Sequence, residues 1–108
     1  MDGPDLARSY YRHIDEGAYG GLRHLLAEGF RQVRPDRTIE GPEAFVRFMR
    51  EDRPTTDTAH RVDALYVGDG HVAVEGRLVR TEGGELFGFV DTFRFEDDRI
   101  ARIHTYTD

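Results

Sequence analysis

Residues 87–95 read Phe87-Gly88-Phe89-Val90-Asp91-Thr92-Phe93-Arg94-Phe95, and this aromatic run predicts a β-strand. Successive side chains of a strand alternate between its two faces. One face therefore carries Asp91 together with four phenyl rings, those of Phe87, Phe89, Phe93 and Phe95. The pattern predicts a sheet with one apolar face, which other elements must cover, and a single acid on that face.

Asp91 is the first candidate site residue, because burial disfavours the charged form of a carboxylate. An acid enclosed by phenyl rings is expected either to hold a proton or to lie beside a cation. Two structural alternatives stay open. A β-bulge would turn Asp91 outward, or a buried Asp91 would cap a loop or pair with an Arg without any role in catalysis.

The strand lies within a longer run of predicted strands in the second half of the chain. Short joints containing Gly or Asp separate them, at residues 68–70, 82–84 and 97–98, and such joints are typical of hairpins. Hairpins predict an antiparallel arrangement. The four predicted strands are Thr58–Val67, His71–Arg80, Glu85–Glu96 and Arg99–Tyr106.

The first half of the chain predicts three helices. Leu6, Tyr10, His13 and Ile14 have helical spacing between Pro4 and a stop at Gly17. A second, short apolar stripe contains Leu22, Leu25 and Leu26 and ends at Gly29. The third helix starts at Gly41-Pro42-Glu43, buries Phe45, Phe48 and Met49, and ends at Pro54.

Between the second and third helices, Phe30–Arg34 predicts a strand, with a brief return over Thr38–Glu40. The count is three helices and about five strands. Helices followed by a meander predict the α+β class, with the helices covering one face of the sheet.

Composition limits the function classes. The chain has 108 residues, no cysteine and a formal net charge of −6, so we expect one domain without disulfides or thiolate metal sites, in the cytoplasm. No apolar run approaches the roughly 20 residues of a membrane span, and the first residues lack the pattern of a signal peptide. The excess of acids disfavours nucleic-acid binding. All 15 basic residues are Arg, which excludes Schiff-base chemistry on a lysine.

The order and spacing of three segments resemble the SnoaL-like domains, which belong to the nuclear transport factor 2-like superfamily together with ketosteroid isomerase and limonene epoxide hydrolase. The segments are the first helix with Tyr10-Tyr11 and residues 15–19, the turn over residues 38–44, and residues 91–100. The resemblance covers nearly the whole chain, residues 1–108. It implies a cone: a strongly bent antiparallel sheet wrapped around three N-terminal helices, with an apolar pocket in its concavity. It also implies a homodimer that packs through the outer face of the sheet.

The resemblance assigns roles to two residues, but the catalytic base of ketosteroid isomerase has no counterpart in this chain. Tyr10 is similar in position to the oxyanion tyrosine of ketosteroid isomerase, and Asp91 is similar to its protonated acid. The base does not carry over, because Arg34 stands before Pro35 where the isomerase has its Asp, and a guanidinium does not abstract a proton. The acid expected in the last strand of the epoxide hydrolases is also missing: that strand has His104, Thr105 and Tyr106.

Alternation along the first strand groups Arg34 with Phe30 and Gln32, on the face toward the pocket. We hypothesise that Arg34 binds an anionic or carbonyl oxygen, that Tyr10 donates a second hydrogen bond, and that Asp91 transfers or positions a proton. His60 shares a face with Val62, Ala64 and Tyr66 and is a candidate proton shuttle at the pocket mouth. The structural alternative is an internal Arg34–Asp91 salt bridge with no ligand. The predicted pocket lining is Ile14, Phe30, Gln32, Phe45, Met49, Tyr66, Phe89, Phe93, Ile103 and Thr105.

No metal site and no cofactor are predicted, because no pair of histidines has metal-ligand spacing and no glycine loop has the setting that cradles phosphate. The predicted partner is a small apolar or amphipathic molecule. The protein is expected to be a cofactor-independent isomerase, dehydratase, cyclase or hydrolase acting on an apolar, oxygen-bearing substrate. The alternatives are a ligand-binding protein without turnover and a dimeric interaction module. A cavity below about 300 Å³ would favour the interaction module.

Overall fold

The computed structural model describes residues 1–53 and 57–108. Helix α1 (Gly3–Glu16) forms as the spacing predicts. Its N-cap is Asp2, whose side chain accepts a hydrogen bond from the Asp5 amide at 2.9 Å. Gly17 ends it in the left-handed conformation, at a φ of 68°, which glycine adopts without steric cost.

Helix α2 (Tyr19–Leu25) is shorter than predicted, and the prediction that it reaches Gly29 is wrong. Leu26 is already extended and begins β1 (Leu26–Val33), where it pairs with Ile100. The predicted leucine stripe is therefore divided between α2 and β1, because the pairing of β1 with β6 ends the helix before Leu26. Gly21 lets α2 approach α1, because a Cβ there would overlap the His13 ring.

A short strand and an interrupted helix follow. β2 (Thr38–Glu40) pairs antiparallel with β1, and α3 (Pro42–Arg47) begins at the predicted proline. The helix continues as a π-helical turn, η1 (Phe48–Asp52), closed by a hydrogen bond of 2.9 Å from the Arg53 amide to the Phe48 carbonyl. The predicted end at Pro54 lies outside the described residues. None of the described helices has the length and apolar character that crossing a bilayer requires.

The second half of the chain forms four strands at the predicted places: β3 (Thr58–Gly68), β4 (His71–Arg80), β5 (Glu85–Glu96) and β6 (Arg99–Thr107). All three hairpins are confirmed. Together with β1 and β2 they make a six-stranded sheet of order β2-β1-β6-β5-β4-β3. The expectation of a purely antiparallel sheet is wrong at one position, since β1 and β6 run parallel. The α+β class is confirmed.

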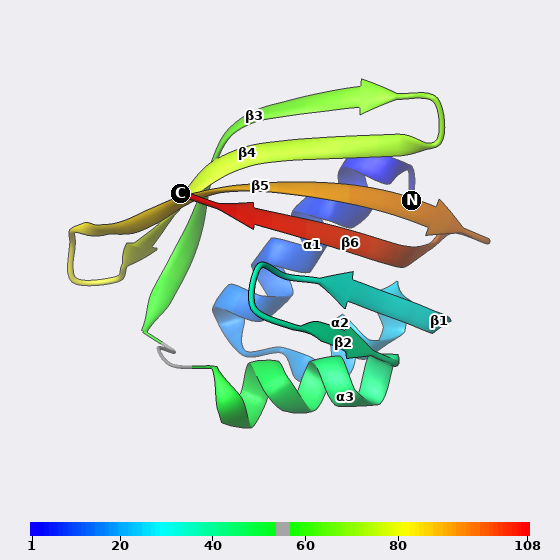
Figure 1. The fold of residues 1–108 in the computed structure, drawn as a ribbon, viewed down its shortest axis with the longest axis horizontal. Coiled ribbons are helices and arrows are strands. Elements are labelled where there is room, and N and C mark those ends of the chain that lie inside the picture. The colour runs from blue at the N-terminus through cyan, green and yellow to red at the C-terminus, as the bar shows by residue number, and fades with distance from the viewer. Residues whose placement is uncertain (54–56) are drawn as a thin grey trace.

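The sheet curls over α1, and its β1–β2 end lies beside α3 (Figure 1). Breaks of register bend it, at Leu26/Arg31, Val62/Ala64, Leu78/Val79 and Arg94/Phe95. Side chains of the concave face pack against the helices: Phe93 is fully buried, and its ring meets that of Tyr10 edge-on at 5.5 Å. This curvature produces the cone and leaves a hollow between sheet and helices.

Candidate functional site

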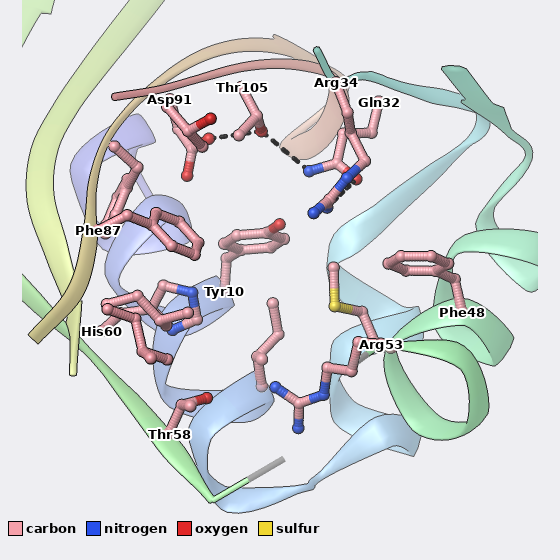
Figure 2. Close-up of a pocket in the computed structure, with 16 residues that line it drawn as sticks. Tyr10, Gln32, Arg34, Phe48, Arg53, Thr58, His60, Phe87, Asp91 and Thr105 are labelled. Carbon is pink, nitrogen blue, oxygen red and sulfur yellow. Dashed lines mark hydrogen bonds between the residues drawn. The ribbon is translucent and has the colours of Figure 1, made fainter. Parts of the chain in front are cut away.

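A cavity of about 200 Å³ lies between the concave face of the sheet and the helices (Figure 2). Half of its lining is apolar or aromatic: Tyr10, Ile14, Phe48, Met49, Leu78, Leu86, Phe87 and Phe89. The polar lining is Gln32, Arg34, Arg53, Thr58, His60, Asp91, Thr105 and Thr107. The cavity is smaller than the roughly 300 Å³ at which pockets for drug-sized ligands begin. By size alone it accommodates only a small molecule.

Asp91 lies on the inner face of β5 and is only 5% exposed, so no bulge turns it outward. Its two oxygens accept hydrogen bonds from different elements. Tyr11 Oη, on α1, donates to Oδ2 at 2.6 Å, and Thr105 Oγ1, on β6, donates to Oδ1 at 2.6 Å. Thr105 is the direct cross-strand partner of Asp91, so the register of the β5–β6 hairpin creates the second bond. Both oxygens accept, which is the arrangement of an ionised carboxylate.

Only two of the four predicted phenyl rings enclose this acid. Phe89 and Phe93 are buried on the same face. Phe87 is 37% exposed and lines the cavity, next to the register break in β5, where Phe87 pairs with Leu78 and Glu85 with Val79. Phe95 is half-buried and stacks on Phe93 at 6.2 Å. The expectation of four buried rings around Asp91 is corrected to two, although Asp91 itself remains buried.

Arg34 reaches Asp91 through two neutral side chains and forms no ion pair with it. Arg34 Nη1 donates to Gln32 Oε1 at 3.2 Å, and Gln32 Nε2 donates to Thr105 Oγ1 at 2.9 Å (Figure 2). A guanidinium only donates, so it fixes which end of the Gln32 amide faces Thr105 and leaves the Thr105 proton for Asp91. The whole relay therefore points toward the carboxylate. Arg34 itself lies over the Phe48 ring at 5.1 Å.

Burial and hydrogen bonding act on the Asp91 carboxyl in opposite directions. Burial raises its pKa above the ordinary value, and this effect prevails. The hydrogen bonds from Thr105 and Tyr11, followed by the charges of His60 and Arg34, lower the pKa in part. Burial, and then the charge of Asp91, also raise the pKa values of Tyr10 and Tyr11 well above the ordinary one. Both phenols therefore stay neutral donors at physiological pH.

The two tyrosines of α1 have different surroundings: one hydrogen-bonds to Asp91 and the other lines the cavity. Tyr11, which our sequence analysis did not select, holds Asp91. Tyr10 lines the cavity, and its hydroxyl makes no hydrogen bond to any residue in the described ranges. Figure 2 shows the Tyr10 ring in the pocket, with its hydroxyl toward the wall that carries Thr105 and Arg34. Helical spacing from Ala7 through Tyr11 to Ile14 was the signal that could have found Tyr11.

His60 lines the cavity but is bound to a different acid. Its Nδ1 lies 2.6 Å from Asp15 Oδ1, and its backbone amide donates to Asp15 Oδ2 at 3.0 Å. The imidazole packs against the rings of Tyr11 and Phe89, with centroids 5.0 and 5.5 Å away. Asp15, at the end of α1, is a second residue that sequence reasoning missed. It orients the His60 ring beside the Tyr11–Asp91 pair.

Arg53 and Thr58 are further residues that the sequence did not reveal. They are the two described residues with a buried side-chain polar atom, Arg53 Nε and Thr58 Oγ1, that has no hydrogen-bond partner. Both line the cavity. No periodicity or motif distinguished them, because the π-helical turn η1 positions Arg53 and the start of β3 positions Thr58.

Five predicted lining residues do not reach the cavity. Phe30, Phe45, Phe93 and Ile103 are fully buried in the core behind it. Tyr66 is 58% exposed on the outer face, where its hydroxyl donates to Glu75 at 3.1 Å. The register break between Val62 and Ala64 reverses the alternation of β3, so Tyr66 no longer shares a face with His60. Ile14, Gln32, Met49, Phe89 and Thr105 do line the cavity, as do Tyr10, Arg34, His60 and Asp91.

His104 pairs with Thr92 on the outer face and stacks on Tyr106 at 4.2 Å, while its neighbours Ile103 and Thr105 are buried.

Within residues 1–53 and 57–108, no group of three or more His, Asp or Glu side chains is arranged to hold a metal ion.

Comparison with known proteins agrees with this architecture. A candidate ketosteroid isomerase from Kribbella flavida is 26% identical, with a TM-score of 0.85 over 96% of this chain and 76% of that one. An NTF2-like protein of unknown function from Cytophaga hutchinsonii is 17% identical, with a TM-score of 0.86 over 100% of this chain and 91% of that one. A candidate polyketide cyclase from Sinorhizobium meliloti is 18% identical, with a TM-score of 0.84 over 98% and 97% of the two chains.

No curated protein matches the chain by sequence. Residues 7–103 match the SnoaL-like domain family. With the curled sheet, the concave cavity and these structural neighbours in agreement, the chain belongs to the SnoaL-like domain family.

Proposed function

We propose that the cavity binds a small, largely apolar carbonyl compound and that Asp91 moves a proton at the carbon next to the carbonyl. The observation that carries this proposal is the pairing of one buried carboxylate with one unengaged phenol in the same cavity. Among the described residues that line the cavity Asp91 is the only acid, and the Tyr10 hydroxyl makes no hydrogen bond to any of the described residues. The neighbouring candidate isomerase and cyclase proteins are compatible with such chemistry.

Asp91 is suited to accept a proton. Burial raises the pKa of Asp91 above its ordinary value, which makes the carboxylate a stronger base. Tyr11 and Thr105 hold both oxygens from two sides, so the carboxylate keeps one orientation. The relay from Arg34 favours the ionised form before substrate binds, which is the form that abstracts a proton.

The step balances without a cofactor. The C–H bond beside the carbonyl breaks, the proton goes to an Asp91 oxygen, and the electron pair moves onto the carbonyl oxygen. Tyr10 Oη donates a hydrogen bond to the resulting oxyanion. Return of the proton to another carbon completes an isomerisation, whereas attack of the carbanionic carbon on a second carbonyl forms a ring.

Exchange of solvent deuterium into cyclohexanone, followed by proton NMR, tests this proposal directly. We expect the wild type to exchange the α-protons above the buffer rate and Asp91→Asn to be slower by roughly 10²–10⁴-fold. Asp63→Asn is the matched control, because Asp63 is half-exposed and pairs with Arg61 at 3.0 Å. Exchange at the buffer rate by the wild type, or at the wild-type rate by Asp91→Asn, contradicts the proposal.

A second candidate is the dimeric interaction module, favoured by the cavity volume of about 200 Å³, which lies below the roughly 300 Å³ at which pockets for drug-sized ligands begin. Calorimetry and deuterium exchange together distinguish the candidates, because a ligand-binding protein takes up cyclohexanone without exchanging it. An interaction domain does neither.

We also propose a homodimer through the outer face of the sheet, in the cytoplasm. Support for the dimer comes from the exposed side chains of Tyr66, Val90 and Tyr106, joined across β3–β6 by the Val90–Tyr106 pair and the Tyr66–Glu75 hydrogen bond. A reducing compartment suits a chain without cysteine. Sedimentation velocity of the wild type and Val90→Arg is the test of the dimer. A wild type that sediments as a monomer at micromolar concentration overturns it.

A further inference from the structure

We infer that Arg53 and Thr58 form a carboxylate subsite in the cavity, so that the ligand is a small organic acid with its carbonyl toward Asp91. This inference rests on the proposed function and names its substrate class. Figure 2 shows Arg53 and Thr58 on the side of the pocket away from Asp91 and Thr105. The two ends of the cavity would then hold two different oxygen functions of one molecule.

Thr58 supplies the first observation. It is 2% exposed, it lines the cavity, and its Oγ1 has no hydrogen-bond partner among residues 1–53 and 57–108. Native structures leave few buried polar atoms in that condition, because each loses its hydration without replacement. A ligand oxygen in the cavity would supply the missing partner.

Arg53 supplies the second. Its Nη2 donates to Tyr19 Oη at 3.3 Å, and Tyr19 Oη donates to the Met49 carbonyl at 3.4 Å. One end of the guanidinium is therefore held in place, while Nε is buried and has no hydrogen-bond partner among the described residues, and Arg53 lines the cavity. No acid of the described ranges lies within ion-pair distance of Arg53, so its charge is not compensated locally.

The chemistry of these groups selects a carboxylate. Arg53 Nε only donates, and the Thr58 hydroxyl has a proton to donate, so the pair suits an acceptor with two oxygens and a negative charge. The chain carries a net charge of −6, and no long-range field attracts an anion to it. Attraction must come from the local guanidinium. Asp91 repels an anion, which orients the ligand with its carboxylate away from the base.

Arg34 is the weaker candidate for the same task. Its Nη1 is engaged with Gln32, and Asp36 Oδ1 lies 4.0 Å from its Nε. A ligand carboxylate would have to compete with both. Arg34→Gln is therefore an informative comparison with Arg53→Gln.

The test is calorimetric binding of three related probes: 4-oxocyclohexanecarboxylate, the matched 4-oxocyclohexanecarboxamide, and cyclohexanone. We expect the carboxylate to bind the wild type about tenfold or more tightly than the carboxamide. Arg53→Gln should remove that preference. Arg50→Gln is the matched control on the same helical turn, since Arg50 is half-exposed and pairs with Glu51.

Thr58→Val and Thr58→Ser keep the test valid if Arg53→Gln does not fold. Thr58→Val removes only the hydroxyl and should weaken the carboxylate several-fold, while Thr58→Ser keeps wild-type binding. Equal binding of carboxylate and carboxamide by the wild type overturns the subsite, as does loss of the preference in Arg34→Gln but not in Arg53→Gln. Deuterium exchange of cyclohexanone by the wild type still decides the proposed function separately.

Discussion

Replacing Thr105 with valine removes the link between the Arg34 relay and Asp91 at almost constant volume. Two hydrogen bonds disappear with one oxygen, the 2.6 Å bond to Asp91 and the 2.9 Å bond from Gln32. A hydrogen bond to a charged group contributes about 1.5–3 kcal/mol, and a buried donor left without an acceptor costs about 1–3 kcal/mol. We therefore expect Thr105→Val to lower the free energy of unfolding by about 2–5 kcal/mol at pH 7.

The decrease in the free energy of unfolding should depend on pH in the way expected if Asp91 is the group that titrates. The bond from Thr105 is the foremost of the effects that lower the Asp91 pKa against burial, so Thr105→Val raises that pKa further. The variant then loses most stability where wild-type Asp91 is ionised. The difference between wild type and variant should shrink as the pH falls and Asp91 takes up a proton.

Urea denaturation at several pH values measures the difference, and carbon-13 NMR of the Asp91 carboxyl follows its titration. Thr92→Val is the matched control, because Thr92 lies one position along β5 on the outer face and should change stability by no more than about 0.5 kcal/mol. Thr105→Ser keeps the hydroxyl and should restore most of the loss. A penalty for Thr105→Val as small as that of the control, or one that does not vary with pH, would refute the reasoning.

Three further outcomes are expected. In the folded state the Asp91 pKa is raised, so its contribution to stability is greatest below the unfolded value of about 3.9 and is lost as the pH rises through the folded value. Urea denaturation should show that the free energy of unfolding of the wild type falls relative to that of Asp91→Asn as the pH rises. A difference that stays constant with pH would contradict a raised Asp91 pKa. Phe93→Ala, at a fully buried ring, should cost about 3–5 kcal/mol by calorimetry, and a loss below about 1 kcal/mol would contradict the packing. Gly76→Ala should lower the melting temperature because its Cβ would overlap the Arg61 carbonyl oxygen, whereas Gly29→Ala, where no described atom lies within 4 Å of the new Cβ, should not; equal effects would contradict this contact.

The sequence predicts those features that depend on neighbouring residues, such as strand alternation, helical spacing and turns. Alternation over residues 87–95 places Asp91 and Phe93 on the buried face, and the helical spacing from Leu6 to Ile14 places α1 against it. Gly and Asp at the joints predict all three hairpins, because these turns depend on the backbone freedom of one or two residues. The resemblance to SnoaL-like domains adds the curvature that periodicity does not contain.

Alternation fails wherever a strand carries an extra residue. The break between Val62 and Ala64 moves Tyr66 to solvent, and the break between Glu85 and Phe87 brings both Leu86 and Phe87 to the cavity lining. Bulges arise where the sheet must bend around α1. The alternation of apolar and polar residues along a strand does not indicate where such bends occur.

What the sequence determines alone is therefore the presence of a buried acid on a strand of a helix-covered sheet. Which groups reach that acid is decided only by tertiary structure, since Tyr11 is 80 residues away from Asp91 in the chain and Gln32 is 73 away from Thr105. Their meeting depends on the parallel pairing of β1 with β6 and on how α1 sits in the curved sheet. Hydrogen bonds require agreement within a few tenths of an ångström, and only the packing of the whole chain sets positions that closely.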